Sequence, residues 1–228
     1  MTIEKEAGAM KKERISNIYK LLVILSLLIG IFLNLVNTTS VRAMLSYYTL
    51  QSNIICLVMF VGMMTVIILH KDYRSSNIYY LLKGGVIITI LVTAITYQIA
   101  LIPNNFSMDV AYKTNTDRIW ANLFVHVISP AMVVGDYILF DIKGNLKYYY
   151  PLIWLFIPLN YVLYVYTYSA KGGRFYGIGG SREFAYIFLD YNQIGYGGVL
   201  KAMGVIVLAI LLVSYLLVFL DRRNRRKK

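Results

Sequence analysis

The chain has 228 residues, of which 58% are hydrophobic and 15% are charged. Soluble domains are nearer half apolar, with about a quarter of their residues charged, so this composition excludes an ordinary soluble protein. The net charge of +12 does not indicate a nucleic-acid-binding protein, because the basic residues lie in short segments between long apolar runs.

Six apolar segments are long enough to cross a bilayer, whose hydrocarbon core takes about 20 helical residues. In chain order they span residues 17–37, 48–69, 80–102, 119–140, 149–168 and 198–220. The other residues form short connections, two tails and one longer segment from Ser169 to Gly197, which leaves no room for a soluble domain. The sequence therefore predicts an all-α, multi-pass membrane protein that forms a single domain over residues 1–228.

The first segment follows the basic run KKER, as the apolar part of a signal peptide would. Its apolar core is longer than the roughly 7–15 residues of a signal sequence, so we expect a retained helix. Most of the 23 basic residues fall near the N-terminus, in the loops after the second and fourth segments, and in the tail DRRNRRKK. This bias predicts that both termini are cytoplasmic, with the tail against anionic lipid headgroups.

With this topology, strongly polar side chains collect in the outer halves of the segments, whereas the inner halves are almost purely aliphatic. The outer-half residues include Asn34, Thr49, Ser52, Asn53, Thr93, Thr96, Tyr97, Gln98, Asn122, His126, Asn160, Tyr161 and Tyr164. Polar groups are costly inside a membrane and are therefore functional suspects. They predict a polar pocket open to the outside above an apolar floor; the alternative is that they join helices through hydrogen bonds.

His126 is one of two histidines in the chain. Asn122, His126 and Pro130 are spaced four apart and so share one helix face. Pro130 has no N–H to bond the carbonyl of His126, which predicts a kink and a free acceptor beside the imidazole. Such a site suits a general base, and a neutral structural histidine bonded to a neighbouring helix is the alternative.

A base needs a hydroxyl to activate, and the candidates are Ser46, Thr49, Ser52 and Ser129. Counted from the start of its helix, His126 lies about 10 Å deep at 1.5 Å per residue. Thr49 lies at a similar depth, about 9 Å, if its helix begins at Ala43. It lies almost two turns away if the helix begins at Tyr48, and the sequence leaves both possibilities open.

The other reactive side chains predict neither a metal site nor a cofactor. Cys56 is the only cysteine, and His70 is far from His126 in the sequence. We expect Asp136, at the inner end of its segment, to cap the helix or to pair with a loop lysine. The segment Ser169–Gly197 is rich in glycine and aromatic residues, which predicts either an interfacial belt or a lid over the pocket.

Three motifs together resemble a known family. YYTLQSN opens the second segment, W-x-N-x-x-x-H with a following proline spans Trp120–Pro130, and FAYIFLDYNQIGYGG precedes the last segment. In this order, on six helices, they resemble the bacterial Pr-six-Pr membrane proteins, which look related to the androgen-induced membrane proteins that hydrolyse fatty acid esters of hydroxy fatty acids. The chain departs from the pattern in the spacing of Pro130 and in carrying Ile187 where a proline is usual.

The resemblance implies that Thr49 is a nucleophile and His126 its base, which is chemistry that a hydroxyl needs. Asn53 or Asn122 is expected to supply oxyanion donors. Together with Gln98, Asn160 and Tyr164, these two residues form the predicted substrate-binding set.

The functional hypothesis is hydrolysis of a lipid or fatty acid ester by Thr49 and His126, with acyl chains in an apolar groove beneath the pocket. The alternative is a non-enzymatic binder or transporter of a small lipidic molecule, or a purely structural role. The expected partners are membrane lipids and a lipidic substrate, with no nucleic acid, and no oligomeric state is specified. The Lys-, Ile-, Asn- and Tyr-rich composition suggests a bacterial chain, and we expect it in the plasma membrane.

Overall fold

The computed structural model describes residues 2–38, 40–70, 73–98, 115–177 and 180–225. Its α-helices are α1 (Thr2–Asn37), α2 (Val41–Leu45), α3 (Tyr48–Ile68), α4 (Asn77–Thr96), α5 (Asn115–Leu123), α6 (Ser129–Phe140), α7 (Tyr150–Trp154), α8 (Phe156–Ala170) and α9 (Tyr191–Arg225). A π-helical turn, η2 (Phe124–Ile128), joins α5 to α6. Two short antiparallel strands, β1 (Phe175–Gly177) and β2 (Gly180–Arg182), and the 3₁₀ turn η3 (Ile187–Leu189) complete the described elements.

The prediction of six helices that are able to span a membrane is confirmed. The described residues hold six helices long and apolar enough to cross a membrane. They are Ala7–Asn37, Tyr48–Ile68, Asn77–Thr96, Arg118–Phe140, Tyr150–Ala170 and Tyr191–Arg225. The length of an apolar run is enough to predict a helix, because a bilayer offers no water to the backbone and each spanning segment must satisfy its own backbone hydrogen bonds.

The helix ends differ from the predicted ones for local reasons. α1 starts at Thr2, because the polar residues before the apolar run are mostly good helix formers. The fifth span is divided at Leu155, three residues before Pro158, which has no N–H to bond the Trp154 carbonyl. The last helix bends at Gly195, whose φ is 68°, a backbone conformation that glycine adopts without steric cost because it has no Cβ. Positions 99–102 of the predicted third helix lie outside the described residues.

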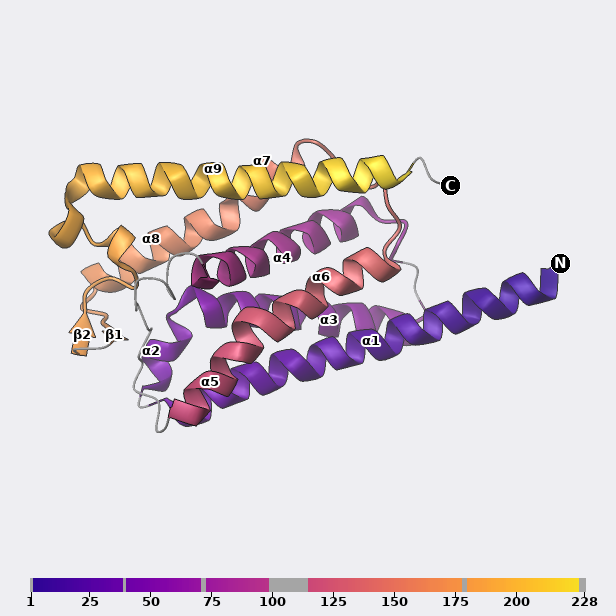
Figure 1. The fold of residues 1–228 in the computed structure, drawn as a ribbon, viewed down its shortest axis with the longest axis horizontal. Helices are drawn as coiled ribbons and strands as arrows, with labels where there is room; N and C mark the ends of the chain where they lie inside the picture. The colour runs from indigo at the N-terminus through magenta and orange to yellow at the C-terminus, as the bar shows by residue number, and fades with distance from the viewer. Residues whose placement is uncertain (1, 39, 71–72, 99–114, 178–179, 226–228) are drawn as a thin grey trace.

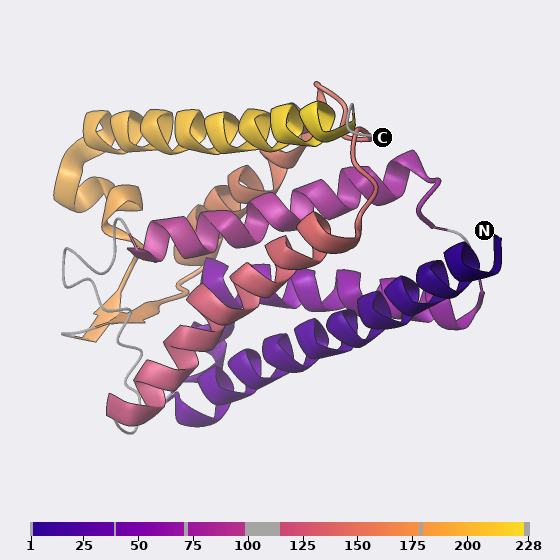
Figure 2. The same cartoon turned by 45° about the vertical axis from the view of Figure 1, so that its right-hand side comes forward.

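The spanning helices surround α4, as Figures 1 and 2 show. α1 packs along α3 on one side and along α5, η2 and α6 on the other. α4 is the most buried span, with 61% of its most apolar window inside the protein, whereas the corresponding share of α9 is 17%. α9 therefore covers the bundle only loosely and leaves most of its surface to the surroundings.

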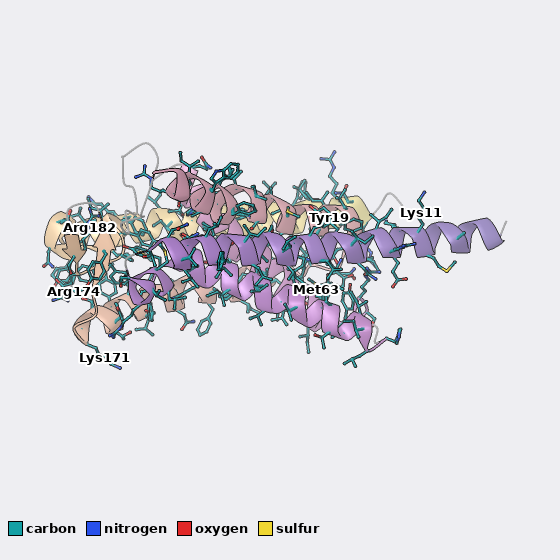
Figure 3. The ribbon with its side chains drawn as sticks, turned by 90° about the horizontal axis from the view of Figure 1, so that it is seen from below. Lys11, Tyr19, Met63, Lys171, Arg174 and Arg182 are labelled. Atoms are coloured by element: carbon teal, nitrogen blue, oxygen red, sulfur yellow. The ribbon has the colours of Figure 1, made fainter. Side chains whose placement is uncertain are left out.

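The bundle has two different ends. The start of α1 and the end of α9 lie together at one end, which we call the terminal end, as an even number of spans requires (Figure 1). The opposite end carries α2, the start of α5 and the β1–β2 hairpin, and we call it the hairpin end. Lys171, Arg174 and Arg182 mark the hairpin end in Figure 3, and Lys11 marks the part of α1 that extends beyond the terminal end.

The segment between α8 and α9 folds back onto the bundle at the hairpin end. Phe175, Phe184, Tyr186 and Leu189 are buried there in one aromatic cluster with α2, α3 and α8. The Tyr166 hydroxyl donates to the Leu189 carbonyl at 2.8 Å, which ties this segment to α8. The segment therefore covers the start of α3, where Thr49 lies.

Candidate active site

Thr49 and His126 are in contact. Thr49 is the second residue of α3, His126 is the middle residue of η2, and the distance from Thr49 Oγ1 to His126 Nε2 is 3.2 Å. Both side chains are buried, with exposed fractions of 4% and 2%. The structure thus brings together the two residues proposed as nucleophile and base.

Thr49 and His126 meet although α3 has the later of the two starts that the sequence left open. α3 begins at Tyr48, the case that should have separated the two residues by almost two turns. That estimate assumed that all helices begin at one level in the membrane. In the structure α5 begins at Asn115 and extends farther towards the hairpin end than α3, so a deeper position in its helix still reaches Thr49 (Figure 2).

The hydrogen bonds of the imidazole assign its tautomer. His126 Nδ1 lies 3.2 Å from the carbonyl oxygen of Asn122, which can only accept. Nδ1 therefore carries the proton, and Nε2 presents its lone pair to the Thr49 hydroxyl. This is the arrangement of a base oriented by a third group, with a backbone carbonyl in the place that a carboxylate often takes.

The π-helical turn presents His126 to α3. The irregularity expected from Pro130 takes this form, and the Ser129 N–H bonds the Phe124 carbonyl across the wider turn. π turns inside α-helices occur frequently at functional sites. α1 supports the turn closely, since a Cβ built on Gly30 would lie 2.9 Å from Cγ1 of Val125.

The start of α3 provides a polar setting for Thr49. The first N–H groups of a helix have no partner within it, and the partial positive charge there favours an anion. Tyr47, the N-cap residue, makes no side-chain hydrogen bond to these groups. An oxyanion formed at Thr49 would thus lie beside backbone donors.

The other hydroxyl candidates have different partners. Ser52 Oγ lies 2.7 Å from Thr93 Oγ1, and the hydroxyls of Ser129 and Ser46 donate to Ser26 Oγ and the Arg42 carbonyl. Among the four hydroxyls considered from the sequence, Thr49 is therefore the one placed against His126 Nε2.

Of the five predicted substrate-binding residues, the structure places Asn53 and Asn122 at the Thr49–His126 pair, and none of the five lines the pocket beside Thr49. Asn53 Nδ2 donates to the carbonyls of Thr49 at 2.7 Å and Val125 at 3.2 Å, so its amide joins α3 to η2. Asn122 contributes its backbone carbonyl to His126.

The other three residues of the predicted substrate-binding set do not line the pocket beside Thr49. Gln98 is exposed, and Asn160, also exposed, donates to the Phe156 carbonyl of its own helix. Tyr164 is half-buried and stacks on Tyr168.

A pocket opens beside Thr49, enclosing about 640 Å³ of space that includes its open mouth. α3, α4, α8, η3 and α9 contribute to its walls, which are mostly apolar. Its polar side chains include Thr49, Thr93, Thr96, Tyr161 and Tyr186.

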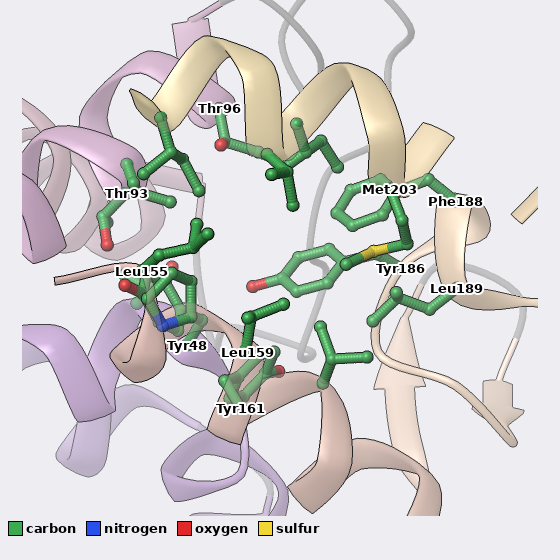
Figure 4. Close-up of a pocket in the computed structure, with 17 residues that line it drawn as sticks. Tyr48, Thr93, Thr96, Leu155, Leu159, Tyr161, Tyr186, Phe188, Leu189 and Met203 are labelled. Atoms are coloured by element: carbon green, nitrogen blue, oxygen red, sulfur yellow. The ribbon is translucent and has the colours of Figure 1, made fainter. Parts of the chain in front are cut away.

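Tyr186 reaches into this pocket from the segment before η3, with its hydroxyl pointing inward (Figure 4). Its side chain is 6% exposed and neighbours Thr49 and Tyr161. Burial raises the pKa of the Tyr186 hydroxyl above its usual range, so the group stays protonated and can donate. Tyr186 is not among the site residues predicted from the sequence, although it lies in the FAYIFLDYNQIGYGG motif.

A second buried polar cluster lies nearer the terminal end, and it corrects the expected apolar floor. Asp136 accepts from Lys20 Nζ at 2.9 Å and from Lys83 Nζ at 2.5 Å, and Lys83 is 3.7 Å from Asp141. The Tyr79 hydroxyl donates to Asp141. The expectation that Asp136 caps its helix or pairs with a loop lysine was wrong, because both lysines lie within spanning helices, α1 and α4.

These features define a class: a helical protein with six helices long and apolar enough to span a membrane, and with a buried Thr–His pair beside a mostly apolar pocket. Comparisons with protein-family models, curated proteins and solved structures find no match to the chain. The resemblance to the Pr-six-Pr proteins accordingly stays a prediction.

Proposed function

We propose that the protein is a membrane-embedded ester hydrolase in which Thr49 is the nucleophile and His126 the general base. The observation that carries this proposal is the 3.2 Å contact between Thr49 Oγ1 and His126 Nε2, with Nδ1 held by a carbonyl. A lipid ester fits this site, because the pocket beside Thr49 is mostly apolar and lies within the spanning helices.

The reaction follows from the hydrogen bonds. His126 Nε2 takes the proton of the Thr49 hydroxyl as Oγ1 bonds to the ester carbonyl carbon. The developing oxyanion receives hydrogen bonds from the N–H groups at the start of α3 and from the Tyr186 hydroxyl. The imidazolium then protonates the leaving alcohol oxygen as the ester C–O bond breaks.

The second half of the reaction uses the same groups. Water gives a proton to His126 Nε2 and adds to the acyl–threonine carbonyl. Collapse of this intermediate releases the carboxylic acid and returns the proton to Thr49 Oγ1, so the site is regenerated.

The proposed location is the plasma membrane of a bacterium, with both termini in the cytoplasm and the hairpin end outside. The distribution of basic residues supports this orientation, since Lys143, Lys147, Arg222, Arg223 and Arg225 all belong to the terminal end. The Thr49–His126 pair would then act on lipids of the outer half of the bilayer.

A second candidate function is transport of a small lipidic molecule. The buried cluster of Lys20, Lys83, Asp136 and Asp141 favours it, because ionisable groups inside a membrane often mark a transport or proton path. The first candidate rests on an assembled nucleophile and base, which a transporter has no need to bring together.

Labelling with a fluorophosphonate probe tests the hydrolase proposal. The purified wild-type protein should form a covalent adduct on Thr49, and Thr49→Ala and His126→Ala should lose it. Ser52→Ala is the matched control, because this hydroxyl lies one turn away in α3 and bonds Thr93 instead of His126. A folded wild type that stays unlabelled, or a Thr49→Ala variant labelled like wild type, would overturn the proposal.

A further inference from the structure

The pocket beside Thr49 continues into a second hollow along the seam between α4 and α9. This hollow encloses about 420 Å³, again including its open side. The two share the lining residues Val92, Thr96, Ile206 and Ile210. They are therefore adjoining parts of one groove, which we call the α4–α9 groove.

The groove is long enough for an alkyl chain. Its lining on α4 extends from Thr96 to Ile88, and its lining on α9 from Met203 to Val213. At 1.5 Å per residue these stretches are about 12 Å and about 15 Å long. They begin near the Thr49–His126 pair and run towards the middle of the bundle.

The groove changes in polarity along its length. Hydroxyl groups of Thr49, Thr93, Thr96 and Tyr186 line the end near the candidate active site. Apart from Thr96, the second hollow is lined by aliphatic side chains alone, and none of the residues lining either hollow is charged. An uncharged ester group at the polar end with an alkyl chain at the other matches this gradient, whereas a charged headgroup would find no partner.

The α4–α9 groove is also accessible from the bilayer. Only 17% of the most apolar window of α9 is buried, and Leu208 and Leu212 on that helix are 62% and 69% exposed. Both hollows are partly open, so a lipid chain can enter sideways between the helices.

We propose that the α4–α9 groove is the acyl-chain subsite of this protein and that Ala209 sets the chain length it accepts. This inference rests on the proposed function for the identity of the reacting group. The substrate is an uncharged ester of a single linear acyl chain, which enters from the bilayer and places its carbonyl at Thr49. Ala209 lines the deeper hollow but not the pocket that contains Thr49, so a larger side chain there shortens the groove without touching the reacting groups.

The test combines hydrolysis with direct mapping of the bound chain. Wild type, Ala209→Phe and Val205→Phe are assayed with the butyrate and palmitate esters of p-nitrophenol. Val205 is the control, because it lies on α9, is 68% exposed and lines neither hollow. For Ala209→Phe we expect kcat/KM to fall about ten- to 100-fold for palmitate and to stay unchanged for butyrate, as pocket contacts of this size allow.

Photocrosslinking reads the same groove without any need for turnover. A fatty acid with a diazirine at the end of its chain should label wild type near Ala209 on α4 and α9, and should lose these adducts in Ala209→Phe. Hydrolysis of both esters with unchanged preference in Ala209→Phe, or adducts on other helices, would overturn the acyl-chain subsite and leave the hydrolase proposal intact. Absence of hydrolysis by wild type with adducts in the groove would overturn the hydrolase proposal and retain the subsite.

Discussion

The rings of Tyr97 and His126 are stacked, with centroids 3.8 Å apart and planes inclined by 16°. Tyr97 follows the last α-helical residue of α4, so α4 covers one face of the imidazole that η2 presents to Thr49. The stack limits rotation of the ring and keeps water from that face. Such ring contacts contribute about 0.5–1.5 kcal/mol beyond the area they bury.

We therefore expect Tyr97→Leu to lower kcat for a model ester about tenfold, the factor that corresponds to about 1.4 kcal/mol. Tyr97→Phe keeps the ring and should stay within about twofold of wild type, a range set by the same relation. Steady-state hydrolysis by the three proteins decides the matter. Equal losses in both variants would show that the hydroxyl, and not the stack, is what matters.

Tyr186→Phe should lower kcat while the protein remains folded. The substitution removes the one polar atom of a side chain that points into the pocket, and losing an oxyanion donor costs about 10²–10³ in kcat. Tyr164→Phe is the matched control, since Tyr164 stacks on Tyr168 and does not line the pocket. A Tyr186→Phe variant with wild-type kcat would exclude Tyr186 as a donor.

Alanine substitutions at Gly62 in α3 and Gly30 in α1 should have opposite effects on the stability of the protein. Gly62 has open space at its Cβ position, so Gly62→Ala should stabilise the protein by about 0.5–1 kcal/mol, the usual gain in a helix. Gly30→Ala places a methyl group 2.9 Å from Val125 Cγ1 and 3.1 Å from Phe124 Cβ. We expect this variant to displace η2 and to lose fluorophosphonate labelling.

Thermal unfolding in detergent and labelling, measured on both glycine variants, check this prediction. If Gly30→Ala is stabilised like Gly62→Ala and is labelled normally, the close packing of α1 on η2 does not position His126.

The buried charge cluster should matter for stability and not for hydrolysis. Lys83→Met leaves Asp136 and Asp141 with less compensation, and removing one partner of a buried pair costs about 3–5 kcal/mol. The double variant Lys83→Met/Asp141→Asn removes one charge of each sign and leaves the Lys20–Asp136 pair in place. It should recover most of this loss, because replacing both partners of a buried pair by neutral residues is often neutral for stability.

Denaturant unfolding of wild type, the single variant and the double variant measures their stability, and ester hydrolysis by the same three proteins measures their activity. Wild-type hydrolysis by the double variant would place the cluster in a structural role. Loss of hydrolysis by a stable double variant would instead couple the two ends of the bundle, as the transport candidate requires.

Asp141, the residue after α6, should make stability depend on pH. Burial raises the pKa of this carboxyl above its ordinary value of 3.8, although the Lys83 charge opposes the shift. Because the folded-state pKa is raised, the protonated Asp141 carboxyl favours the folded state. This contribution to the free energy of unfolding is fully present below pH 3.8 and is lost as the pH rises through the folded-state pKa. Asp141→Asn cannot titrate, so its stability relative to wild type should increase as the pH rises from the ordinary value of 3.8 through the raised folded value. Melting temperatures of the two proteins across this range provide the check, and a constant difference would contradict the assignment.

The sequence by itself determined the number and approximate place of the spanning helices. A bilayer demands about 20 apolar residues per helix, and six such runs are visible without any knowledge of their packing. It also restricted the search for a site, because Thr49 and His126 are polar residues in apolar surroundings and polar residues there are costly. Asp136 shows the limit of this reasoning, since its place in the sequence does not reveal which lysines it meets.

Only the tertiary structure decided which side chains touch. The Thr49–His126 contact depends on the relative level of α3 and α5, on the π turn at η2 and on the close approach of α1 at Gly30. The pocket depends on Tyr186, which arrives from a segment whose sequence was compatible with either a belt or a lid. Helix levels, rotations and loop paths are set by contacts between residues far apart in the chain, whereas hydrophobic length and periodicity are local properties, and this is the physical reason for the division.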